Sequence, residues 1–123
     1  MKQELQLYVQ EALEKRLKEA GTTNPVYLLS YCYENTQALH EVLKENNISH
    51  KIQYGGLKQD LEDEGLAHTK ENIEAIGARH YWVESHGYIC EIVTEDPTQQ
   101  LADAVVLDER PEEYIFVETI ETY

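Results

Sequence analysis

The sequence of 123 residues predicts a single α+β domain, in which a helix layer packs on an antiparallel sheet of about four or five strands. The first observation is a pair of helical patterns before residue 46, where apolar residues recur every three or four positions. The second is a series of short alternating segments from residue 49 onward, rich in β-branched and aromatic side chains. With 41% hydrophobic residues, the chain can build one core.

The first third of the chain is predicted to be helical. Residues 2–20 place their apolar side chains on one helical face, and Gly21 follows where a helix C-terminus favours glycine. We expect residues 24–30 to be an extended lead-in to a second helix. That helix is predicted to begin at Cys32 or one residue earlier and to run to about Asn46.

The remaining segments supply the strands of the predicted sheet. We expect strands at residues 49–54, 79–84, 88–94, 104–107 and 114–119. Residues 57–78 are predicted to form one or two short helices with Gly65 and Gly77 as breaks, and residues 96–100 to form a loop. The predicted organisation is an N-terminal helix at residues 1–21, a catalytic core at residues 25–95 and C-terminal strands at residues 96–123.

The net charge of −14 restricts the partners of the protein. Ten basic residues against 24 acidic ones exclude simple attraction to nucleic acid or to an anionic membrane surface. A high-salt cytoplasm is an alternative origin of this charge, since salt screens the self-repulsion of an acidic protein. No apolar run has the length of a membrane span, and the N-terminus is too polar for a signal peptide. We therefore expect a cytoplasmic protein in which both cysteines are reduced; its oligomeric state is left open.

The segment from His80 to Glu84 and the strand after it carry an imidazole and a carboxylate. If the loop between the strands has four residues, His80 lies opposite Glu91. If the loop is His86-Gly87, His80 lies opposite Val93. Both registers place His80 and Glu91 on one face, because side chains alternate with a period of two. Opposite and diagonal neighbours lie within about 8 Å, so the carboxylate reaches the imidazole.

Cys32 is predicted to lie in the first turn of the second helix. The free N–H groups and the positive dipole end of a helix start favour a thiolate over a thiol, and a nearby histidine adds to this effect. A thiol, an imidazole and an acid are the parts of a cysteine nucleophile. The sequence therefore predicts thiol acyl chemistry.

These residues resemble a known family. Cys32 at the start of a helix, Gly55-Gly56 after the next strand, and His80-x-Trp82-x-Glu84 are similar to the transglutaminase-like branch of the papain-like cysteine fold. The similarity in order runs from about residue 32 to residue 95, and small members of unassigned substrate look most alike. It implies a Cys-His-acid triad that performs amide hydrolysis, deamidation or acyl transfer on a peptide, protein or small amide. We expect neither a cofactor nor a metal.

On this interpretation Cys32 is the nucleophile, His80 is the general base and later the acid, and Glu91 fixes the imidazole tautomer. The family usually has Asp where this chain has Glu91. An alternative acid is Asp96, because Asp96-Pro-Thr matches a motif found in many members of the family. In either hairpin register Asp96 passes beyond the His80 end of the strand, so Glu91 is favoured.

The donors of an oxyanion hole are less evident. The family usually places Gly two residues before the nucleophile, where this chain has Ser30, and nothing upstream matches the oxyanion glutamine of papain-type enzymes. The candidate donors are the backbone N–H of Cys32 and the side chains of Tyr27 or Tyr33. Trp82 is predicted to be a core or pocket-lining aromatic.

Two other functions compete with catalysis. One is an inactive transglutaminase-like domain that binds a peptide or a partner protein in the same cleft. The other is a metal site, using His80, His86 and Cys90, or else His40 and His50. Zinc ligands usually come at tight local spacings that this chain lacks, and Cys90 is expected to point into the core, away from His80.

Overall fold

The computed structural model describes residues 1–95 and 101–123 and confirms the α+β class. The helices are α1 (Lys2–Ala20), α2 (Cys32–Glu45), α3 (Lys58–Asp63) and α4 (Lys70–Ile76), with a short 3-10 helix, η1, at Pro25–Leu28. The strands are β1 (Lys51–Leu57), β2 (Arg79–Ser85), β3 (Tyr88–Glu95), β4 (Leu101–Leu107) and β5 (Tyr114–Thr122). They form one antiparallel sheet in the order β4-β3-β2-β1-β5.

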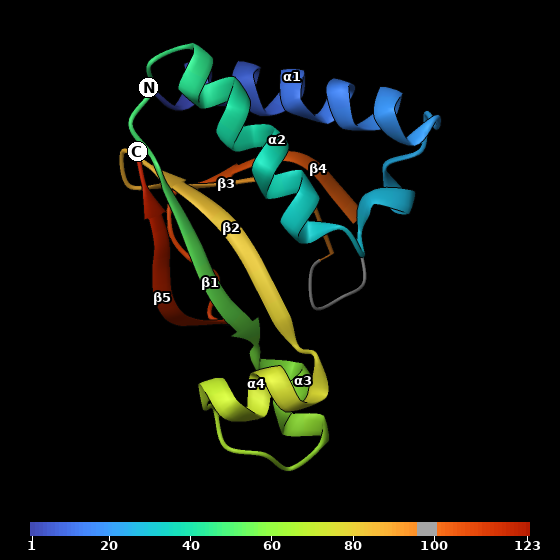
Figure 1. Ribbon diagram of the computed structural model, residues 1–123, viewed down its shortest axis with the longest axis vertical. Helices are drawn as coiled ribbons and strands as arrows, with labels where there is room; N and C mark the ends of the chain where they lie inside the picture. Colours follow the sequence, from blue (N-terminus) through green and yellow to red (C-terminus); the bar gives the residue numbers. More distant parts are fainter. Residues whose placement is uncertain (96–100) are drawn as a thin grey trace.

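Two layers hold the main core. Helices α1 and α2 contact each other and cover the part of the sheet formed by β3, β4 and the end of β2, as Figure 1 shows. The short helices α3 and α4 lie at the opposite end of β1 and β2, far from this layer (Figure 1). None of the described helices is long and apolar enough to cross a bilayer.

The hydrophobic residues separate into a large cluster and a small one. The large cluster joins the inner faces of α1 and α2 to side chains such as Val83, Cys90 and Ile92. The small cluster contains Trp82, Ile89 and Tyr114. Because neighbouring residues of a strand point to opposite faces, Trp82 and Ile89 lie on the face away from the helices. The sheet is therefore covered by the helix layer on one face and carries a separate aromatic cluster on the other.

Strands β2 and β3 pair only near their hairpin. Their ladder contains Val83 opposite Cys90, Glu84 opposite Ile89 and Ser85 opposite Tyr88, which is the register with the two-residue loop. Both loop residues have positive φ, 51° at His86 and 83° at Gly87, as a tight hairpin turn requires. Beyond Val83 the two strands diverge, and β2 continues beside β1 while β3 stays beside β4 (Figure 1). We call this divergence the fork.

Several predicted boundaries are corrected. The lead-in before α2 is not extended but contains η1, because the Asn24 side chain accepts from the Val26 N–H and Pro25 begins the turn. Strand β1 runs to Leu57 instead of ending before the glycines, since Gly55 and Gly56 pair with β2 and β5. A Cβ on Gly55 would collide with the carbonyl of Ile115, so the glycine has a structural role.

The last two strands are longer than predicted, since β4 begins at Leu101 and β5 ends at Thr122. The two short helices between β1 and β2 are confirmed, and the expected helices over residues 2–20 and from Cys32 match α1 and α2. The loop expected at residues 96–100 lies outside the described residues.

Candidate active site

Cys32 is the first residue of α2, and a buried amide fixes this helix start. Asn35 accepts a hydrogen bond from Arg16 Nε at 3.0 Å and donates to the carbonyl of Leu28 at 2.8 Å. These bonds tie α2 to α1 and to η1. The backbone N–H of Asn35 also donates to the carbonyl of Tyr31 at 2.9 Å, which closes the first turn. The Cys32 side chain is partly exposed, as a thiol that must meet a substrate requires.

His80 and Glu91 are in direct contact at the fork. The distance from His80 Nε2 to Glu91 Oε1 is 2.7 Å, and the two side chains are 12% and 4% exposed. In the observed register Glu91 is a diagonal neighbour of His80, and diagonal neighbours lie farther apart than opposed residues. The glutamate side chain is long enough to span this distance. This contact assigns the Nε2 proton to the bond with Glu91 and leaves Nδ1 for another partner.

The second partner of His80 is Cys32. Cys32 lies near enough to the imidazole for its side chain and its charge to raise the pKa of His80. A residue at the start of α2 and two residues from diverging strands therefore meet at the fork. The structure brings together the three residues that the sequence nominated for a triad.

The charges around His80 favour its protonated form. Burial lowers the pKa of His80, but the Glu91 charge, the hydrogen bonds with Cys32 and Glu91, and the Cys32 charge together outweigh burial and raise it to about 9. His80 is therefore an imidazolium at neutral pH. The arrangement pairs one cation with a carboxylate on one ring nitrogen and a sulfur on the other.

Aromatic rings enclose the imidazole. His80 stacks on Trp82 with ring centroids 5.8 Å apart and an interplanar angle of 27°, and the Tyr114 ring lies 4.5 Å from His80. Trp82 is only 1% exposed, and among the described side chains its indole Nε1 is the one buried nitrogen or oxygen without a hydrogen-bond partner. Trp82 thus packs against the base and does not face solvent, so it is not placed as an oxyanion donor.

The space beside the thiol is small. A cavity of about 10 Å³ lies between the start of α2 and β3, and its lining includes Cys32, Tyr81 and Glu91. That volume is about enough for one water. A larger open hollow of about 610 Å³ adjoins the helix start on its other side, lined by Arg16, Ala20, Gly21, Thr22, Tyr27 and Tyr31. A substrate therefore has room on the surface near Tyr31 and not in the interior.

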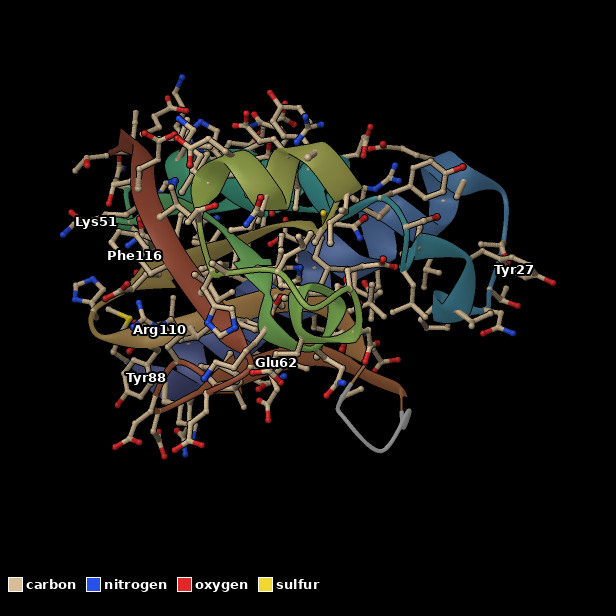
Figure 2. The ribbon with its side chains drawn as sticks, turned by 90° about the horizontal axis from the view of Figure 1, so that it is seen from below. Tyr27, Lys51, Glu62, Tyr88, Arg110 and Phe116 are labelled. Carbon is tan, nitrogen blue, oxygen red and sulfur yellow. The ribbon has the colours of Figure 1, made fainter. Side chains whose placement is uncertain are left out.

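The remaining predicted site residues lie in different places. Tyr27 is 65% exposed and projects outward from η1 at the far end of the molecule in Figure 2. Tyr33 is half exposed, and its ring meets the Tyr81 ring edge-on at 5.3 Å. Tyr33 therefore contacts a residue that lines the cavity beside Cys32, whereas Tyr27 lines the open hollow with Tyr31. The alternative acid Asp96 lies outside the described residues.

Sequence reasoning missed two tyrosines of this site. Tyr81 lines the cavity beside Cys32, and strand alternation could have placed it on the helix side together with Val83. Tyr114 donates a hydrogen bond to Glu91 Oε2 from β5. No local pattern connects Tyr114 with Glu91, because β1 and β2 lie between their strands in the sheet.

The structure does not assemble the metal sites considered from the sequence. His86 is exposed at the hairpin turn, while Cys90 is buried in the core facing the helices. His40 Nδ1 and His50 Nε2 are instead hydrogen-bonded at 2.7 Å, and His50 Nδ1 donates to the carbonyl of Ile48 at 2.7 Å. Within the part of the chain that the structure describes, no three His, Cys, Asp or Glu side chains are placed to hold a metal ion.

Comparison of the chain with protein-family models, with curated proteins and with solved structures finds no match.

Buried His50 and partly buried His80 should make the stability depend on pH in opposite directions. Burial, chiefly, lowers the pKa of His50, so its contribution is present above pH 6.5 and is lost as the pH falls below that value. The raised pKa of His80 gives a contribution that is complete below pH 6.5 and lost as the pH rises to about 9. Urea unfolding at pH 5, 6.5 and 9 measures these contributions. The free energy of unfolding should fall less toward acid pH in His50→Gln than in the parent. It should fall less toward alkaline pH in His80→Gln than in the parent.

The His80 contribution can reach about 3 kcal/mol, from about 1.36 kcal/mol for each unit of pKa difference. His68→Gln, which alters an exposed histidine, is the control and should keep the parent's slopes. Parent slopes in all three variants would contradict the assignment of these protons.

Proposed function

We propose that the protein carries out thiol-dependent acyl chemistry on an amide carbonyl, with Cys32 as nucleophile, His80 as proton donor and acceptor, and Glu91 as the group that orients His80. The observation that carries the proposal is the 2.7 Å hydrogen bond between His80 and Glu91 beside Cys32, which also raises the pKa of His80. The proposal is supported by a partly exposed thiol, an imidazole that is 12% exposed and a buried acid. Such an arrangement activates a weak nucleophile.

The raised pKa of His80 sets the order of the proton transfers. The Cys32 thiolate attacks the carbonyl carbon, so that a C–S bond forms and the carbonyl π electrons move to oxygen. When the C–N bond breaks, the leaving nitrogen takes the proton from His80 Nδ1. The products of this half-reaction are a free amine and a thioester on Cys32. His80 thus acts first as an acid and then as a base, which reverses the order expected from the sequence, because it begins as an imidazolium.

The second half-reaction restores the starting state. The neutral imidazole now accepts a proton from water or from an amine as that group attacks the thioester carbonyl. The C–S bond then breaks and its electrons return to sulfur, so that Cys32 is again a thiolate beside an imidazolium. Attack by water gives hydrolysis or deamidation, and attack by an amine gives acyl transfer. The N–H groups of the first turn of α2, which lack an intrahelical partner, are the candidate backbone donors for the oxyanion in both attacks.

A peptide or protein side chain fits the surroundings better than a small enclosed ligand. The interior cavity beside Cys32 has only about 10 Å³, so the reacting carbonyl must approach from the exposed side of the thiol. Tyr31 and Tyr33 flank Cys32 there and are 48% and 50% exposed. Exposed aromatic side chains next to a hollow are typical of contact surfaces for polypeptides. A reducing compartment such as the cytoplasm would keep both thiols free, as they are here.

A second candidate is an inactive binding module for a peptide or partner protein. The specific observation in its favour is that Trp82, one of the candidate oxyanion donors, is buried at 1% exposure. A site without a side-chain oxyanion donor binds a carbonyl without strongly accelerating its reaction. In this case a peptide ligand would protect Cys32 from alkylation although no amide, ester or acyl-acceptor assay detects turnover.

Alkylation should separate the two cysteines. At pH 6 iodoacetamide should modify Cys32 before Cys90, because Cys32 is a partly exposed thiol beside the His80 imidazolium. Cys90 should remain unmodified, since it is 1% exposed and burial, helped by the Glu91 charge, raises its pKa to about 12. His80→Ala should slow the modification of Cys32 by roughly tenfold or more. Peptide mass spectrometry measures both rates.

The control for this experiment is His68→Ala, which removes an exposed histidine near Glu62. Slow and equal modification of both cysteines, unchanged in His80→Ala, would contradict the catalytic interpretation and leave only the description of the fold.

Replacing the acid should test turnover. Glu91→Gln keeps the shape of the side chain but removes its charge, so the rate on a peptide or glutamine amide should fall by orders of magnitude. The comparable change in a serine-protease triad costs roughly 10⁴-fold. Glu91→Asp should retain some activity, although its shorter side chain must span a diagonal pair. Amide release by the purified variants, at matched folded fraction, is the measurement.

Asp96→Asn is the matched control, because it removes the other acid that the sequence offers as a candidate. It should leave the rate unchanged. Loss of activity in Asp96→Asn together with a normal rate in Glu91→Gln would transfer the role of the acid to Asp96.

A further inference from the structure

We propose that Tyr114 is a positioning residue of this site, whose hydroxyl holds the Glu91 carboxylate in the orientation that accepts a hydrogen bond from His80. The inference rests on the proposed function for its kinetic consequence, but its geometric part stands on the contacts of Glu91 alone. It assigns a role in the site to β5, the last strand of the chain.

The two oxygens of Glu91 have different partners. Oε1 accepts from His80 Nε2 at 2.7 Å, and Oε2 accepts from the Tyr114 hydroxyl. An ionised carboxylate has no proton to give, so Tyr114 must be the donor. Burial, reinforced by the Glu91 charge, raises the pKa of Tyr114, so the hydroxyl keeps this proton. The tyrosine oxygen then accepts from Thr94 Oγ1 at 3.2 Å.

These donors converge on Glu91. Thr94 donates to Tyr114, Tyr114 donates to one oxygen of Glu91, and His80 donates to the other oxygen. Because both carboxylate oxygens are engaged, Glu91 cannot rotate about its last bond without losing a partner. Its side chain is 4% exposed, so the loss of a donor leaves a buried oxygen unpaired. The proton on Nε2 is thereby fixed.

Tyr114 reaches Glu91 from a distant part of the sheet. Two strands, β2 and β1, separate β5 from β3 in the sheet order. At the end of β1, Tyr114 pairs with Leu57, and its ring crosses the face of the sheet to lie 5.1 Å from Trp82 and 4.5 Å from His80. The ring therefore packs on the base while the hydroxyl holds the acid.

Tyr114→Phe separates these two roles, because it keeps the ring and removes the hydroxyl. Without the Tyr114 donor, the Glu91 carboxylate loses the bond that holds Oε2 and can turn away from His80. His80 then loses its main source of positive-charge stabilisation. The titratable side chains that face His80 are Glu91 from β3, Cys32 from α2 and Tyr114 from β5. The midpoint at which His80 loses its proton, followed by NMR of its ring, should fall from about 9 toward 6.5. With an amide substrate, kcat should fall by about 10- to 100-fold at unchanged KM, the usual effect of losing an outer-shell partner.

Tyr54→Phe is the matched control, since Tyr54 is also a buried tyrosine. Its hydroxyl lies 3.4 Å from a carboxylate outside the site, that of Glu74 in α4. It should leave the His80 midpoint unchanged. If Tyr114→Phe does not fold, Thr94→Val is the second variant, because it removes the donor to the Tyr114 oxygen and should produce a smaller fall of the same sign.

The outcomes distinguish the inference from the proposed function. A parent-like His80 midpoint in Tyr114→Phe, with or without a loss of thermal stability, would overturn the positioning role, as would an unchanged midpoint in Thr94→Val when the first variant is unfolded. A fall of the midpoint in a protein without amide turnover would support the role of Tyr114 and reject the catalytic proposal. A fall of both the midpoint and kcat supports both.

Discussion

The site depends on a buried charge, the Glu91 carboxylate, and on the donors that make its burial tolerable. A carboxylate that is 4% exposed is unfavourable unless each oxygen has a partner, and here those partners are His80 and Tyr114. The same contacts raise the pKa of His80 to about 9 and hold its ring between two aromatic neighbours. Removing the negative charge would therefore change the protonation of His80 and, through it, the state of Cys32.

The divergence of β2 and β3 gives this charge its place. If the two strands remained paired to their ends, the sheet would separate Cys32 on the helix side from His80 on the other side. Their ladder ends at Val83 and Cys90, so the fork lets side chains from both faces meet. Helix α2 directs its first residue to this opening because Asn35 is bonded to Arg16 and Leu28. Fold and site thus follow from the same local arrangement.

The fold class and three members of the site could be predicted because their signals are local. Helical periodicity predicted that α2 begins at Cys32 or one residue earlier. Strand alternation placed His80 and Glu91 on one face in either hairpin register. Tyr114 could not be predicted, since its contact with Glu91 depends on the position of β5 across two intervening strands. Similarly, η1 depends on a side-chain bond of Asn24, and the extension of β1 through Gly55 depends on pairing with β5.

The central claim is that Cys32, His80 and Glu91 act as one acyl-transfer unit, and trapping of the covalent intermediate tests it most directly. The protein would be treated at pH 7 with the p-nitrophenyl ester of a short N-acyl peptide and analysed by peptide mass spectrometry. The account predicts one acyl group on Cys32, removable by hydroxylamine as a thioester, and its absence in His80→Ala. Acylation confined to lysine side chains, or equal acylation of Cys32 with and without His80, would contradict it.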